Sequence, residues 1–340
     1  MDEDLIEPRA RARQTGREAL EKSLHRTLDV GTLSHGWIVA GPEGAGKATL
    51  AYRLARAVLD PDALNSADTL DMDETARTFR LIAGNAHPDL FVAERLWDEK
   101  KSKYQAEITV ETIRKLTAFL SRTAAGGGAR VAIVDCADDM NRNAANALLK
   151  ALEEPPANTL LLLLSSTPGR LLPTIRSRCR RIDLAPLSDE LVESFLIDEG
   201  VSIDDAKNIA SHARGRPGYA LSLAEGEGAD AIRLAHRFLT AAQKGGDISK
   251  IISGVSGKAG EARWPVFLDT VLTELSDAAR TAAMGAHAKS FEGVSPGGLL
   301  NAWQMLTHLS SRGEALNLDR AQMLQAMAFD LRAALKDQAA

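Results

Sequence analysis

The feature that most constrains the fold is a short apolar segment, Trp37–Ala40, that runs directly into a glycine-rich stretch from Gly41 to Lys47. After Lys47, residues such as Leu50, Leu54 and Val58 follow at helical spacing. The order is therefore a strand, a glycine-rich loop and a helix. Parallel strands need a crossover connection, which is usually helical, so this order predicts the first unit of a parallel α/β sheet.

Four further strands are predicted. Three are short apolar runs at Leu90–Val92, Val131–Val134 and Leu160–Leu164, and the fourth, Cys179–Leu184, contains Ile182 and Leu184. Helical patterns lie between most of these runs, which favours an open sheet covered by helices. Strand signals stop at Ser188. We therefore predict an α/β domain at residues 1–185, a small helical domain at 186–229 and an all-α domain at 230–340.

The composition is that of an ordinary soluble globular protein, with 340 residues, 45% apolar residues and a formal net charge of −5. Two cysteines, Cys136 and Cys179, cannot form a disulfide framework or a cysteine-rich zinc site. The acidic start Met1–Asp4 is unlike a signal peptide, and the longest aliphatic run, Leu160–Leu164, is too short to span a bilayer. These features predict a cytoplasmic protein with no membrane partner.

The loop fits the phosphate-binding pattern G-x-x-x-x-G-K-[ST] except at its last position. Its glycines let backbone N–H groups curl around phosphates, and the lysine pairs with phosphate oxygens. Ala48 stands where a hydroxyl would bind Mg²⁺, and the next residue is turned by about 100° on a helix. A tight turn before a helix is the alternative. We predict a phosphate loop by descent, leave open whether ATP or ADP binds, and name as candidates Gly41, Gly44, Gly46, Lys47 and Thr49.

The strand Val131–Val134 ends at Asp135, a placement typical of the carboxylate that helps hold Mg²⁺ in nucleotide hydrolases. Many ATPases carry a glutamate next, which orients the attacking water, but here the next residue is Cys136. Asp138 and Asp139 lie at the wrong offset for that geometry. We interpret Cys136 as a small, half-buried residue without chemistry. The loss of both the hydroxyl and the second carboxylate argues against a working ATPase.

Two further motifs point to a family. Asn146–Pro156 reads NALLKALEEPP after the acidic strand, and Ser177-Arg178-Cys179 follows later in the chain. Together they resemble the AAA+ clamp-loader subunits of DNA replication, and Ser34–Trp37, Gly84–Asp89 and Ala157–Thr159 agree. The degenerate nucleotide site makes the chain most similar to the delta-prime subunits of bacterial DNA polymerase III. Residues 230–340 match only in kind.

The resemblance implies a P-loop AAA+ domain, a helical lid and a helical collar that holds subunits in a ring. It also implies a structural subunit that hydrolyses no ATP, requires no cofactor and has no polymerase activity. Its partners would be the other clamp-loader subunits of a hetero-pentameric ring, with the sliding clamp and primed DNA reached through the complex. Direct binding of this acidic chain to DNA would be minor and salt-sensitive.

By resemblance, Arg178 contacts the γ-phosphate of ATP bound to a neighbouring subunit, a task that suits a permanently charged, bidentate guanidinium. A plain surface arginine is the alternative, since Arg176, Arg180 and Arg181 crowd the same stretch. The family usually carries an arginine in the lid, called sensor 2, but the matching position here is Gly218. This is a third departure from the pattern of an active loader ATPase, after Ala48 and Cys136. Sensor 1 falls at Ser165 or Ser166, which keep a hydroxyl. Residues 50–130 contain no cysteine, so no metal is expected.

Two other functions compete with this interpretation. The first is a self-sufficient AAA+ ATPase motor subunit, which Lys47 and Asp135 favour and which Ala48, Cys136 and Gly218 oppose. The second is a small-molecule kinase. It accounts for neither Asn146–Pro156 nor the motif around Arg178, and we rank it last.

Overall fold

The structure is a computed structural model of the chain. It describes residues 7–29, 34–65, 68–98, 103–125, 127–257, 260–285, 291, 294–315 and 318–335. The chain divides into two compact units. The first takes residues up to Phe195 together with Arg214–Tyr219, and the second takes Leu196–Ala213 and the residues from Ala220 on. The predicted division at 185 and 229 stays a prediction.

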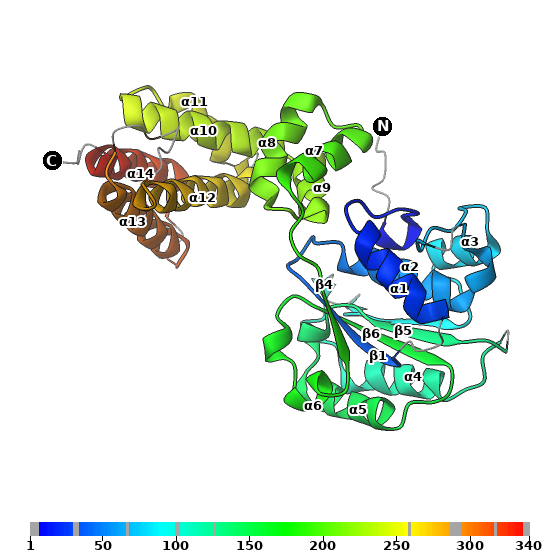
Figure 1. Ribbon diagram of the computed structural model, residues 1–340. Coiled ribbons are helices and arrows are strands. Elements are labelled where there is room, and N and C mark those ends of the chain that lie inside the picture. Colours follow the sequence, from blue (N-terminus) through cyan, green and yellow to red (C-terminus); the bar gives the residue numbers. More distant parts are fainter. Residues whose placement is uncertain are drawn as a thin grey trace. The chain divides into compact units, whose positions relative to one another are not determined.

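The first unit is built on a parallel sheet of five strands in the order β2-β5-β6-β1-β7 (Figure 1). All five predicted strands are confirmed, and their bounds are Gly36–Ala40 (β1), Leu90–Ala93 (β2), Arg130–Val134 (β5), Thr159–Ser165 (β6) and Arg180–Asp183 (β7). β1 lies between β6 and β7, so the glycine-rich loop that follows it leaves from inside the sheet. The predicted fold class, α/β followed by all-α, is confirmed.

Helices cover both faces of this sheet (Figure 1). One face carries α1 (Glu18–Asp29), α2 (Lys47–Leu59) and α3 (Arg77–Ala83), and the other carries α4 (Val110–Leu120), α5 (Arg142–Glu153) and α6 (Pro173–Arg176). Successive strand residues enter opposite cores, as the two-residue period of a strand requires. Val39, Ile133 and Leu162 pack with α2, whereas Ile38, Val134 and Leu163 pack with α4 and α5.

Several short elements were not predicted. They are a hairpin of Trp97–Asp98 (β3) and Lys103–Tyr104 (β4), and 3₁₀ turns at Pro8–Ala10 (η1), Pro61–Ala63 (η2), Ala137–Asp139 (η3) and Pro168–Arg170 (η4). Strands of two residues are too short to show an alternating pattern, and a single 3₁₀ turn shows no helical period.

The second unit is helical throughout its described part. Its helices are α8 (Ile203–Ala213), α10 (Gly228–Lys244), α11 (Ser249–Val255), α12 (Arg263–Ala283), α13 (Pro296–Ala315) and α14 (Arg320–Leu335), while α7 (Asp189–Asp198) and α9 (Pro217–Glu225) are shared between the units. One apolar core joins α10, α12, α13 and α14 through side chains such as Phe238, Phe267, Leu306 and Leu331. Among the described helices, none combines the length and apolar character needed to cross a bilayer.

A buried ion pair ties α1 to α2. Both Nε and Nη2 of Arg53 donate to the carboxylate of Glu21, at 2.8 and 2.6 Å, and Nη2 also donates to Asp71 at 2.8 Å. The side chains of Arg53 and Glu21 are only 1% and 4% exposed. Removing one member of such a pair leaves a charge in the interior, so both are needed once one is present.

We therefore expect Glu21→Ala to lower the free energy of unfolding by about 3–5 kcal/mol. The matched control is the exposed ion pair of Lys22, which lies on α1 as Glu21 does, with Asp68. Lys22→Ala should cost less than about 1 kcal/mol, because solvent screens an exposed pair. Urea denaturation followed by circular dichroism measures both, and equal losses would contradict the importance of the buried pair.

Candidate functional site

The carboxyl ends of three neighbouring strands carry the predicted nucleotide-site residues. Gly41 follows β1, Asp135 follows β5 and Ser165 ends β6. The Gly41 amide donates to the Ser165 carbonyl at 3.1 Å, which joins the start of the loop to the next strand. In open α/β sheets ligands bind at this edge. The structure therefore brings the predicted residues together.

Two glycines of the loop have backbone conformations that favour glycine. Gly44 and Gly46 have φ of +78° and +90°. A Cβ at Gly44 would lie 2.5 Å from the Tyr219 amide nitrogen, and the Gly218 amide donates to the Gly44 carbonyl at 2.8 Å. The predicted sensor-2 segment thus packs on the loop through its backbone, and an arginine is absent from position 218.

The other glycine, Gly46, is contacted by the side chain of Gln14, a residue that precedes α1. A Cβ there would lie 2.5 Å from Nε2 of Gln14, which donates to the Gly46 carbonyl at 2.9 Å. Gln14 was not predicted as part of the site. A lone glutamine in a charged segment carries no sequence signal for this contact.

The ammonium group of Lys47, the residue expected to meet phosphate oxygens, is bonded within the protein. Its Nζ donates to the backbone oxygens of Gly41 at 2.8 Å and Pro42 at 2.9 Å, and to Oγ of Ser166 at 2.9 Å. Burial lowers the pKa of Lys47, while nearby acidic groups act in the opposite direction. Three acceptors fill the three N–H positions of an ammonium group.

The two residues after Lys47 supply no metal ligand. Ala48 has no oxygen, and Thr49 is buried within α2. None of the hydrogen bonds formed by the described residues joins the Thr49 hydroxyl to the loop or to Asp135. The expectation that one residue along a helix turns the side chain away agrees with this placement.

Asp135 and Cys136 follow β5 as predicted. Burial raises the pKa of Asp135, and the positive charge of Lys47 partly offsets that effect. Cys136 is half-buried with φ of +62°. Burial, followed by a hydrogen bond with Asp139, raises the pKa of the Cys136 thiol to about 12. The neutral thiol cannot replace the carboxylate that would orient water.

Asp138, which the sequence placed at the wrong offset, has a definite structural position. Its carboxylate accepts from Ser165 Oγ at 2.7 Å, the Ser166 amide at 2.6 Å and Thr167 Oγ1 at 3.1 Å. Burial alone would raise its pKa, but these hydrogen bonds together lower the pKa of Asp138. The fully buried Ser165 hydroxyl thus points to Asp138, and Ser166 is the serine that meets Lys47.

Arg178 lies at the opposite edge of the sheet. It follows α6 and precedes β7, and a Cβ on Gly36, the first residue of β1, would lie 3.7 Å from the Arg178 carbonyl oxygen. Its Nη1 donates to the Thr174 carbonyl at 3.0 Å, and its Nη2 pairs with Glu153 at 2.9 Å. The Arg178 side chain is 36% exposed.

Comparisons with known proteins identify the family of the chain. A family model described as "DNA polymerase III, delta subunit" matches residues 16–188. The delta-prime subunit of Escherichia coli K12 is 31% identical over 245 residues, which cover 71% of this chain and 70% of that protein. The chain belongs to the delta-prime family of DNA polymerase III subunits.

Two further relatives match shorter parts of the chain. The delta-prime subunit of Pseudomonas aeruginosa is 42% identical over 148 residues, 43% of this chain and 42% of that protein. The gamma subunit of Buchnera aphidicola is 28% identical over 216 residues, 62% of this chain and 56% of that protein. The chain thus matches less than half the length of the Pseudomonas relative.

The link from Asp138 to β6 yields a prediction for this delta-prime family member. Asp138→Ala should lower the free energy of unfolding at pH 7 by about 1–3 kcal/mol, because the buried Ser165 hydroxyl loses its acceptor. Since the folded pKa of Asp138 is lowered, the contribution is present above the unfolded pKa of about 3.9 and is lost as the pH falls through the folded value.

Urea denaturation at pH 7 and at pH 3 measures both effects, and hydrogen exchange of β6 localises them. The exposed Asp183, paired with Arg181, is the control because Asp183→Ala breaks only a surface ion pair. A wild-type advantage over Asp138→Ala that grew on acidification would have the wrong sign and would contradict the assignment.

Proposed function

We propose that the chain is a structural clamp-loader subunit that hydrolyses no ATP itself and supplies Arg178 to the ATP site of a neighbouring subunit. The observation that carries the proposal is the position of Arg178 at the sheet edge opposite its own phosphate loop. Its partners in this proposal are the other subunits of the loader ring, and it meets the sliding clamp and primed DNA through that ring.

Arg178 is too far from the phosphate loop of its own chain to contact a phosphate bound there. β1 runs from Gly36, beside Arg178, to Ala40, just before Gly41. Five extended residues span roughly 16 Å, more than the reach of an arginine side chain across its own sheet. An arginine at this position can meet a γ-phosphate only when that phosphate belongs to another chain.

The state of the phosphate loop supports the absence of hydrolysis. Hydrolysis of Mg·ATP needs a hydroxyl for the metal and a carboxylate for the water, and Ala48 and Cys136 supply neither. The residues present therefore do not fit a catalytic Mg·ATP site. ATP or ADP could enter only if the hydrogen bonds of Lys47 with its own loop were exchanged for bonds with phosphate.

The surroundings of Arg178 suit a group that acts on a partner. Its ion pair with Glu153 is half-exposed, so exchanging this carboxylate for a phosphate oxygen costs little. The Thr174 carbonyl holds the other arm of the guanidinium. The side chain is therefore presented in a defined direction before any partner binds, which reduces the entropy lost on contact.

We expect Arg178→Ala to slow ATP hydrolysis at the neighbouring site by about 10³-fold or more, the scale of arginines that act in trans. In a loader with several sites, the readout is the fall in clamp- and DNA-stimulated ATP turnover of the assembled complex. Arg178→Lys should not restore it, because an ammonium lacks the planar fork.

Arg181→Ala is the matched control, since Arg181 lies on the same stretch and its ion pair within the described residues is with the exposed Asp183. Ring assembly, measured by size-exclusion chromatography, should be unchanged in both variants. Full turnover in an assembled Arg178→Ala complex would overturn the proposed role.

A self-sufficient ATPase is the alternative, and Lys47 and Asp135 are the residues that favour it. On our proposal the purified chain alone turns over no ATP above the background of a Lys47→Ala preparation. A phosphate-release assay measures this difference. Turnover that Lys47→Ala abolished would establish the alternative, and it would leave the test of Arg178 in the complex to be judged separately.

A further inference from the structure

Three metal-ligating side chains converge in the second unit, away from the phosphate loop. His212 lies in the last turn of α8, His236 lies on α10 and Glu274 lies on α12. One ligand atom from each residue lies within 4.8 Å of the other two. Neither the proposed function nor the family resemblance uses these residues.

The hydrogen bonding of His212 fixes which nitrogen carries its proton. Nδ1 lies 3.0 Å from the Asn208 carbonyl oxygen, which can only accept, so Nδ1 is the donor. Nε2 is then the nitrogen with the lone pair in the neutral ring. A backbone carbonyl that orients a histidine in this way is typical of metal-binding histidines.

The free nitrogen of His212 points into the cluster without a hydrogen-bond partner. The side chain is 6% exposed, and Nε2 is a buried nitrogen that no described group satisfies by hydrogen bonding. Its nearest acidic atom is Oε1 of Glu274, at 3.7 Å. In the neutral ring the lone pair of Nε2 lies near this carboxylate oxygen, and a cation bound between the two atoms would remove their repulsion.

A divalent cation bound among these atoms would satisfy the buried nitrogen and the carboxylate at once, because it accepts electron pairs from both.

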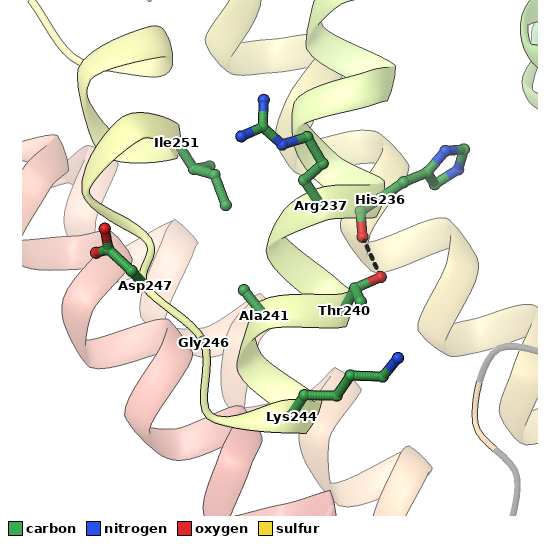
Figure 2. Close-up of a pocket in the computed structure, with 8 residues that line it drawn as sticks. All are labelled: His236, Arg237, Thr240, Ala241, Lys244, Gly246, Asp247 and Ile251. Atoms are coloured by element: carbon green, nitrogen blue, oxygen red, sulfur yellow. Dashed lines mark hydrogen bonds between the residues drawn. The ribbon is translucent and has the colours of Figure 1, made fainter.

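His236 completes the set from the next helix. Its Nε2 lies 3.6 Å from Oε1 of Glu274, and its ring centroid lies 5.2 Å from that of His212. His236 also lines a surface hollow of about 410 Å³, together with Lys244 and Asp247. Figure 2 shows its ring pointing away from Asp247 and Ile251, two other residues that line this hollow.

We propose that His212, His236 and Glu274 bind one Zn²⁺ ion. Two imidazoles and a carboxylate suit zinc and not the all-oxygen preference of Mg²⁺ or Ca²⁺. Tetrahedral zinc with bonds of about 2.0–2.2 Å separates its ligand atoms by about 3.4 Å. The separations of 3.6 and 3.7 Å to Glu274 lie within a few tenths of an ångström of that value.

The ion would cross-link three helices of the second unit and leave a fourth position to water. The sequence-based expectation of no metal considered cysteine ligands, and this site contains none. Its ligands are separated by 24 and 38 positions along the sequence. Only the packing of α8, α10 and α12 brings them together.

The test is Zn²⁺ binding by the full chain after removal of metal with a chelator. Isothermal titration with zinc chloride should give one equivalent per chain, and the melting temperature should rise with zinc and fall again with chelator. Glu274→Gln and His236→Gln replace half-exposed ligands with side chains of similar size, so both should fold. Each should weaken binding by at least about tenfold, the lower end of the loss for groups that only support a metal ligand.

His308→Ala removes an exposed histidine of α13 and should bind zinc as the wild type does. Circular dichroism of each variant without zinc verifies that it is folded. Absence of zinc uptake by the wild type would overturn the proposal. Equal uptake by Glu274→Gln and the wild type would also overturn it, since the ion would then sit elsewhere.

Discussion

The first unit depends on one constraint. The ammonium group of Lys47, at the carboxyl edge of the sheet, needs hydrogen-bond acceptors. In a functional phosphate loop this charge is met by phosphate oxygens. Here Gly41, Pro42 and Ser166 meet it, and Asp138 holds Ser166 in place through its amide. The loop, the end of β6 and the turn after β5 are thus one network. Ala48 and Cys136, which lie beside this network, offer neither a side-chain hydroxyl nor a carboxylate.

That network gives Lys47 a structural role that needs no bound phosphate. A buried ammonium group without acceptors would be costly, but with three acceptors it closes the loop onto its own sheet. Tyr219 and the side chain of Gln14 then occupy the space where side chains at Gly44 and Gly46 would lie. The phosphate loop can therefore act as a rigid structural element. Such a role suits a subunit whose proposed contribution, Arg178, lies at the other end of the strands.

Sequence patterns were sufficient for the architecture because burial on both faces leaves continuous apolar runs. β5 and β6 were predicted from such runs, whereas β7, in which only Ile182 is buried, was predicted from Ile182 and Leu184. The carboxyl edge follows from the parallel direction of the strands. Patterns could not reveal that Asp138 binds the end of β6, since that contact joins residues 27 and 28 positions apart through side-chain geometry. The same holds for Gln14 and for the backbone of Gly218. A contact made by a single polar atom does not change the hydrophobic periodicity of the sequence, so the sequence pattern does not reveal it.

The two proposed contributions of this chain rely on different kinds of interaction. Arg178 must leave a half-exposed ion pair and bind a partner, so its energetics have to be weak and reversible. The cluster of His212, His236 and Glu274 has the opposite character, because a buried nitrogen without a partner favours an ion that stays bound. A metal that fixes α8 against α10 and α12 would stiffen the helical unit without affecting the phosphate chemistry. Loss of zinc and loss of the arginine should therefore separate experimentally, the first as a change in thermal stability and the second as a change in ATP turnover of the assembled ring.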